Sequence, residues 1–145
     1  MDPHFAKAHE VMGHIYLVKG MYKESIREYQ AAEYYGGGQL PGFLGYAYAR
    51  AGNKKEALRI LGELQPRSAG IESHLAMVEM GLGDREKAMA WLEKIYKQHG
   101  DDLLVDLNIQ PFSSIFAPLH SDPRFQEIVR GLKLLPAVDA PAGGD

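Results

Sequence analysis

The residues whose types and spacing come nearest to a metal-binding pattern are two histidines near the start of the chain. His9 and His14 occur in His-Glu-Val-Met-Gly-His, which is one residue longer than the zinc-protease helix motif. Five residues of α-helix rotate the second imidazole by about 140° from the first, so the two rings would lie on different sides of the helix. We therefore interpret both as packing or solvated histidines and expect no metal here.

Other residues that could support catalysis lack the partners that the chemistry requires. The chain contains no Cys, which excludes a disulfide framework, a thiol nucleophile and a Cys-based zinc site. The three glycines at 36–38 are not followed by the Lys-Ser/Thr of a phosphate-binding loop, and there is no Gly-x-Ser-x-Gly nucleophile elbow. Carboxylates that meet only after folding are not visible in the sequence. We predict a protein that is not an enzyme and has no cofactor.

The composition is that of an ordinary helical, water-soluble domain. The 145 residues carry 16 Lys and Arg against 19 Asp and Glu, and the net charge of −3 argues against nucleic acid or an anionic membrane as the main partner of this segment. No apolar run approaches the roughly 18 residues of a membrane span, and the N-terminus has no signal-peptide pattern. We therefore predict a cytoplasmic protein with no membrane partner.

An internal repeat organises the first two-thirds of the chain. Three segments align, and in each a large apolar residue precedes a small one. A Gly follows seven positions later, and another small residue five positions after that Gly. Recurrence of this kind is typical of repeat architectures. The marker glycines, 32 and 31 residues apart, are Gly20, Gly52 and Gly83.

Each copy of the repeat predicts two helices. The marker glycines fall where a first helix must end, because Gly enters the left-handed C′ conformation without a steric penalty. Asn53 and Asp84 are suitable N-caps for the second helices of the second and third copies. Apolar residues at three- and four-residue steps then give one buried face. We expect helices at about 3–18, 22–35, 40–51, 54–64, 70–82 and 85–98, with breaks between repeats at 36–38 and 65–66.

This repeat resembles the tetratricopeptide repeat, whose signature is the order large, small, aromatic, Gly, small, aromatic and Ala. The third copy departs from it at Glu79, where the family has an aromatic residue. The resemblance implies an all-α protein, an α-solenoid of antiparallel helix pairs, with repeats at about 3–37, 38–68 and 69–98. The matching residues of the first copy are Met12, Gly13, Tyr16, Gly20, Ser25, Tyr29 and Ala32.

Residues 99–135 are expected to close the array. A short helix is expected at 101–107, Asp122 and Pro123 predict the start of a capping helix over 122–133, and the tail 136–145 is predicted to be disordered. The stretch 116–132 resembles the segment that ends the repeats of many bacterial signalling and transcription-regulatory proteins. With Pro3 at the position of the closing proline of an earlier repeat, this resemblance predicts that the chain is the C-terminal part of a longer protein.

The resemblance also implies that the chain binds a peptide or helix, in a regulatory or scaffolding role, within a concave groove formed by the first helix of each repeat. The Lys and Asn residues with which some members clamp a chaperone tail are replaced here, so that partner is not expected. Phe43, Tyr46, Met77 and Met80 would be exposed and would suit an apolar or amphipathic segment; alternatively, several of them pack against a neighbouring repeat. The implied groove residues are Lys7, Glu10, His14, Gln39, Phe43, Tyr46, Arg50, His74 and Met77.

Two other functions remain open at this level. A small-ligand sensor would have a pocket between the repeats and the closing segment, where Phe112, Phe116 and Phe125 gather. The plainer explanation of these rings is a hydrophobic plug over the last helix pair. A homodimer would form through the N-terminal face of the first helix, which an earlier repeat would otherwise cover, because exposed apolar faces recruit partners.

Overall fold

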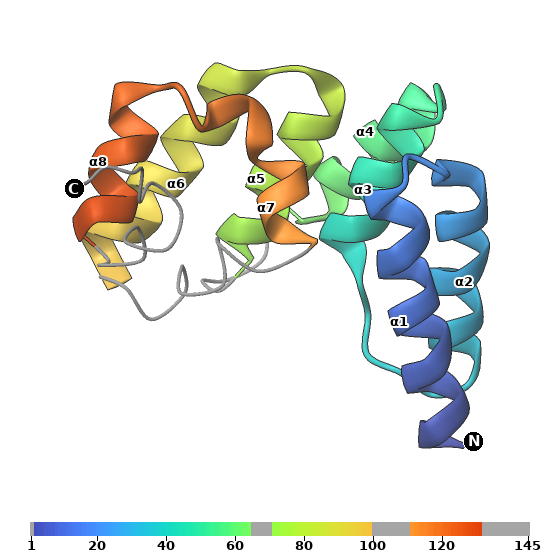
Figure 1. Cartoon of the computed structure of the whole chain (residues 1–145). Helices are drawn as coiled ribbons and strands as arrows, with labels where there is room; N and C mark the ends of the chain where they lie inside the picture. Colours follow the sequence, from blue (N-terminus) through green and yellow to red (C-terminus); the bar gives the residue numbers. More distant parts are fainter. Residues whose placement is uncertain (1, 65–70, 100–110, 132–145) are drawn as a thin grey trace.

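The computed structural model describes residues 2–64, 71–99 and 111–131, and within these ranges the chain is helical with no strand (Figure 1). The predicted all-α fold class is therefore confirmed at this level. No helix in the described ranges is both long and apolar enough to cross a membrane. The break at 65–66, the expected helix at 101–107 and the tail at 136–145 lie outside the described residues.

The helices follow the predicted order, and the six helices of the repeats begin and end within two residues of the predicted positions. The capping helix is also present, starting one residue after the predicted position. The elements are α1 (Pro3–Val18), α2 (Tyr22–Tyr34), α3 (Pro41–Arg50), α4 (Lys54–Leu64), α5 (Glu72–Leu82), α6 (Arg85–His99), α7 (Phe112–Ile115), the short 3-10 helix η2 (Ala117–Leu119) and α8 (Pro123–Gly131).

The turns between paired helices form as the residue types predict. The marker glycines Gly20, Gly52 and Gly83 have φ angles of 76°, 92° and 86°, in the left-handed region where any Cβ is disfavoured. The carboxamide of Asn53 accepts the backbone N–H of Glu56 at 3.2 Å, and the carboxylate of Asp84 accepts that of Lys87 at 3.0 Å. Both N-caps are therefore confirmed.

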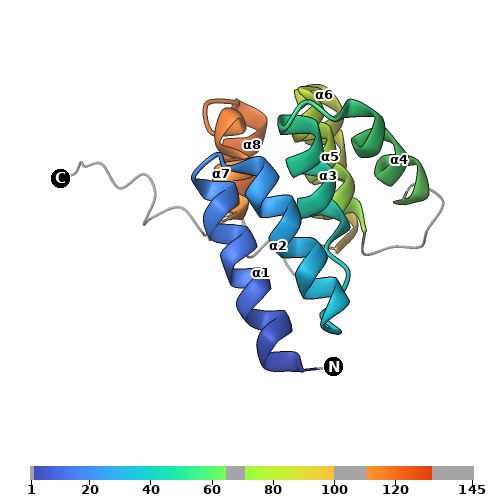
Figure 2. The same ribbon diagram turned by 90° about the vertical axis from the view of Figure 1, so that its right-hand side faces the viewer.

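Small residues let the helices pack closely. α1 packs along α2, α3 packs against both α4 and α5, and α5 packs against α6 (Figure 2). Gly13 lies against the ring of Tyr29, and Gly45 lies against Val78, so that a Cβ at either glycine would collide with its neighbour. The prediction that small residues at these positions allow close approach is confirmed.

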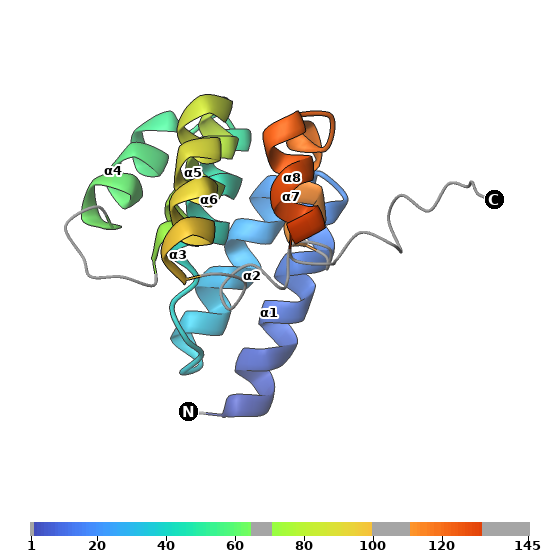
Figure 3. The same cartoon turned by 90° about the vertical axis from the view of Figure 1, so that its left-hand side faces the viewer.

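The closing segment lies on the third helix pair. α7 contacts α5, and α8 contacts α6 (Figure 3). Asp122 accepts the backbone N–H of Arg124 at 2.8 Å and Pro123 begins α8, as predicted for its N-terminus. The core is continuous from the first pair to this segment, whose buried apolar residues are Ile115, Phe116, Leu119, Phe125, Ile128 and Val129.

Candidate interaction surfaces

The apolar residues expected to line an open groove are buried. Phe43, Tyr46, Met77 and Met80 are all less than 9% exposed, so the prediction that they are exposed is wrong. The physical reason is the packing of α3 against α5, to which the closing segment adds a cover over Phe43. The ring of Phe112 in α7 packs on Phe43 at a centroid distance of 5.3 Å.

Neighbouring rings complete the burial of two of these aromatic residues. Phe43 also lies 5.8 Å from the ring of Tyr29. Tyr46 meets Tyr22 edge-on at 6.1 Å, and burial raises the pKa of the Tyr46 phenol to about 12. These side chains belong to the core. This agrees with the alternative prediction that they pack against a neighbouring repeat.

The polar groove residues are divided between structural contacts and open surface. His74 Nδ1 accepts the backbone N–H of Gly42 at 3.1 Å, which joins α5 to the first turn of α3. The guanidinium of Arg50 lies 5.5 Å from the centre of the Tyr22 ring, within cation–π range. Gln39 is exposed beside a cavity of about 150 Å³ between α2, α3 and α4. These three residues do not converge on one site.

The groove residues of α1 make local contacts. Lys7 pairs with Glu10 one turn further along the helix. His14 Nδ1 lies 2.7 Å from the hydroxyl oxygen of Tyr29, and its ring lies 4.7 Å from that of Phe43. Burial lowers the pKa of His14, although the nearby Glu10 carboxylate opposes the effect. Among the predicted groove residues, the structure thus brings His14 of α1 into contact with Phe43 of α3.

His9 lies on a different side of α1 from His14. Its Nδ1 is 2.8 Å from a carboxylate oxygen of Glu28, and its ring stacks on Tyr35 with centroids 5.4 Å apart and planes 4° apart. Phe5 contacts the same Tyr35 ring at 5.6 Å, and Tyr34 meets it edge-on at 5.2 Å. These aromatic residues form a partly exposed cluster at the open end of the α1–α2 hairpin.

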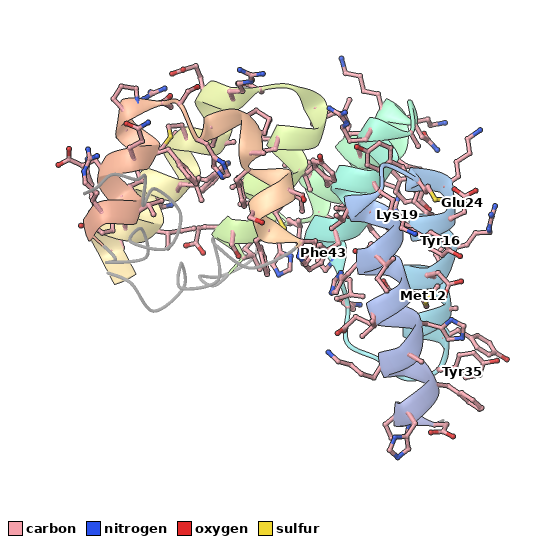
Figure 4. The ribbon with its side chains drawn as sticks, viewed as in Figure 1. Met12, Tyr16, Lys19, Glu24, Tyr35 and Phe43 are labelled. Carbon is pink, nitrogen blue, oxygen red and sulfur yellow. The ribbon has the colours of Figure 1, made fainter. Side chains whose placement is uncertain are left out.

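Most of the exposed large apolar side chains in the described residues lie on one face of α1 that the list of groove residues omits. We call it the outer face of α1, and it lies opposite the helix's own buried stripe of Ala6, Gly13 and Leu17. Its five large side chains are between 38% and 57% exposed, and Figure 4 shows Met12 along the open side of the helix. The outer face comprises Phe5, Ala8, Val11, Met12, Ile15 and Val18.

The alignment of the three repeat copies also indicates that this face of α1 is a contact surface. Val78 in the third copy packs on α3 at Gly45, and Gly81 packs on α3 at Tyr46. The aligned positions of the first copy are Ile15 and Val18. The outer face of α1 therefore presents positions that, two repeats later, are covered by a preceding helix.

Glu79 carries a buried carboxylate near the end of α5. Glu79 is 4% exposed, and no hydrogen bond or ion pair joins its carboxylate to another described residue. Burial raises its pKa, with the Lys87 ammonium opposing this. This is the position where the first two copies have Tyr16 and Tyr48.

A shallow cleft of about 380 Å³ separates α6 from α8. Its floor is apolar, and both signs of charge stand at its rim. Arg124 is held at 2.8 Å by Glu86 and by Asp122, and its hydrogen bonds lower the pKa of both carboxyls. The cleft is lined by Glu93, Tyr96, Lys97, Pro123, Arg124, Glu127 and Ile128.

No group of three or more His, Asp or Glu side chains in the described ranges is placed to hold a metal ion. The described residues present three features at the surface besides the cavity near Gln39: the outer face of α1, the aromatic cluster around Tyr35, and the cleft between α6 and α8. Comparison of the chain with protein-family models, with curated proteins and with solved structures finds no match.

Proposed function

We propose that this chain is a protein-interaction module that binds its partner through the outer face of α1. The module would be a tetratricopeptide-like solenoid with a regulatory or scaffolding role in cytoplasmic signalling or transcription regulation. The observation that carries the proposal is the run of large apolar side chains on one side of α1, each at least 38% exposed. A surface of this kind marks a contact site in proteins that otherwise bury such residues.

The outer face has the mechanical support that an interaction surface needs. α1 is anchored along its length on α2, where Ser25 donates its hydroxyl to the carbonyl of Gly13 at 2.8 Å and the ring of Tyr29 covers Gly13. A helix fixed in this way presents its side chains with little further loss of backbone entropy on binding. The partner would bury apolar side chains against it, as an amphipathic helix does.

The inner surface is the weaker candidate. Its apolar residues contribute to the core, and Phe112 already occupies the position over Phe43 that a bound peptide would take. The exposed residues that remain there, Lys7, Gln39 and Arg50, are separate polar side chains. Binding energy in protein interfaces comes mainly from buried apolar and aromatic anchors, which the outer face of α1 provides.

Co-purification with matched variants tests this proposal. The tagged chain is expressed unchanged, with Ile15→Glu, and with Leu58→Glu, which places the same charge at an exposed apolar residue of α4. We expect a partner that the unchanged chain and Leu58→Glu retain and that falls at least tenfold with Ile15→Glu. Equal retention by all three chains would contradict the proposal, provided that circular dichroism shows equal helicity.

A second candidate function is a small-ligand sensor, and the cleft between α6 and α8 favours it. This cleft lies between the third repeat and the closing segment, and charged side chains such as Lys97 surround an apolar floor. A thermal-shift screen should then identify a metabolite that raises the melting temperature of the unchanged chain and has no effect on Lys97→Ala. A screen with no stabilising metabolite would count against a sensor.

A further inference from the structure

We propose that the outer face of α1 binds the same face of a second copy of this chain, with the two helices antiparallel across a twofold axis between Val11 and Met12. This inference rests on the proposed function and names its partner. A twofold contact requires a surface that is complementary to itself after rotation. The sizes and charges along α1 meet this requirement in the antiparallel orientation.

The one small residue of the outer face, Ala8, falls where the antiparallel pair needs room for a large side chain. With the axis between Val11 and Met12, Ala8 lies opposite the partner's Ile15, and by symmetry Ile15 lies opposite the partner's Ala8. The small residue therefore leaves room for the large one at both ends of the central contact. Beside the axis, Val11 lies next to the partner's Val11 and Met12 lies next to the partner's Met12. The centre of the contact is therefore apolar.

The charges favour the antiparallel orientation over the parallel one. The outer face carries no acidic side chain, and Lys19 at its C-terminal end has no ion-pair partner among the described residues. Asp2 caps the N-terminal end, where its carboxylate accepts the backbone N–H of His4 at 2.9 Å. An antiparallel pair brings Lys19 level with the first turn of the partner's α1, which the Asp2 carboxylate caps. A parallel pair would place the two Lys19 ammonium groups together.

The position of α1 gives a second copy access. The N-terminal half of α1 and the C-terminal end of α2 extend beyond the remaining helices (Figure 1). Among the described elements α1 packs mainly on α2, on the side opposite the outer face. The antiparallel alignment of the two helix dipoles also places each C-terminus beside the partner's N-terminus, which is favourable.

Single cysteines test the geometry, because the chain has none of its own. Met12→Cys lies beside the axis and should form a disulfide-linked dimer alone. Ala8→Cys and Ile15→Cys should link to each other when mixed and should not link alone, because each lies about 10 Å along the axis from its own counterpart. Efficient linking of Ile15→Cys alone would overturn the antiparallel arrangement.

Light scattering after gel filtration tests the dimer itself. The unchanged chain and Leu58→Glu should show twice the mass of one chain at high concentration, and Ile15→Glu should show the mass of one chain with unchanged helicity. A monomeric unchanged chain at millimolar concentration overturns the second-copy inference. If the unchanged chain is monomeric but Ile15→Glu abolishes co-purification of a different protein, the proposed function stands and only the second-copy inference fails. If Ile15→Glu also leaves co-purification unchanged, the proposed function fails as well.

Discussion

The ring of Phe112 packs on the ring of Phe43, with centroids 5.3 Å apart and planes inclined by 60°. This contact joins the closing segment to the second repeat, and it covers a surface of α3 that would otherwise be open. Phe43 in turn contacts His14 of α1, so a row of rings links three parts of the chain. The inner surface is consequently part of the core.

Replacing Phe112 with Ala should destabilise the fold. The half-buried ring would lose its contact with Phe43 and leave a gap over α3, so we expect the free energy of unfolding to fall by about 2 kcal/mol. Urea denaturation measures this change. The comparison is Phe5→Ala, whose ring is 57% exposed and whose loss should cost less than about 1 kcal/mol. Equal losses would contradict the role given to α7.

Two glycines in helices should respond to Ala in opposite directions. A Cβ at Gly81 would lie 2.9 Å from the Cα of Tyr46, where the backbone of α3 cannot yield easily, so Gly81→Ala should destabilise by about 1–3 kcal/mol. Gly62 of α4 has no atom within 4 Å of such a Cβ. Gly62→Ala should therefore stabilise by about 0.5–1 kcal/mol. Thermal melting of both variants checks the signs, and stabilisation by Gly81→Ala would contradict the close packing of α3 on α5.

The helices and their ends could be predicted from the sequence because their signals are local. A glycine such as Gly52 ends one helix, and Asn53 caps the next through its own side chain. The spacing of small residues likewise predicted close contacts such as that of Gly13 with Tyr29. Each of these effects arises within one pair of helices that are consecutive in the sequence.

The candidate site was less predictable because it depends on contacts between distant parts of the chain. Nothing in the neighbourhood of Phe43 indicates that Phe112 will cover it. The outer face of α1 could have been found from the alignment, since Ile15 corresponds to Val78, which packs on a preceding helix. The tetratricopeptide resemblance directs attention to the inner surface, and the closing segment changes what is open there.

Glu79→Gln should stabilise the fold at neutral pH. Burial raises the pKa of Glu79, so its ionised form is less favourable in the folded chain than in the unfolded chain, and the neutral amide should gain on the order of 1 kcal/mol. The gain is complete above the folded-state pKa and disappears as the pH falls toward the ordinary pKa of glutamate. Urea denaturation at several pH values measures it. The control is Glu127→Gln, an exposed carboxylate; a destabilised Glu79→Gln would show that the charge is favourable where it lies.

Stability should also fall in mild acid because of His14. Its pKa is lowered in the folded chain by burial, so below about pH 6.5 the unfolded chain takes up a proton that the folded chain does not. The free energy of unfolding therefore decreases from the ordinary histidine pKa down to the folded-state pKa, and is constant with respect to this group beyond it. His14→Gln should remove this part of the pH dependence, and His4→Gln, on the exposed first turn, should retain it. An unchanged profile in His14→Gln would contradict the assignment.

Site-specific photo-cross-linking in cells tests most directly whether the outer face of α1 is an interaction surface. A benzophenone amino acid is placed at Val11, and at Leu58 as an equally exposed control on α4. We predict protein adducts on irradiation at Val11, none at Leu58, and loss of the Val11 adducts when Ile15→Glu is added. The mass of the adduct distinguishes a second copy from another protein. No adduct at Val11, or equal yields at both positions, would contradict the proposed function.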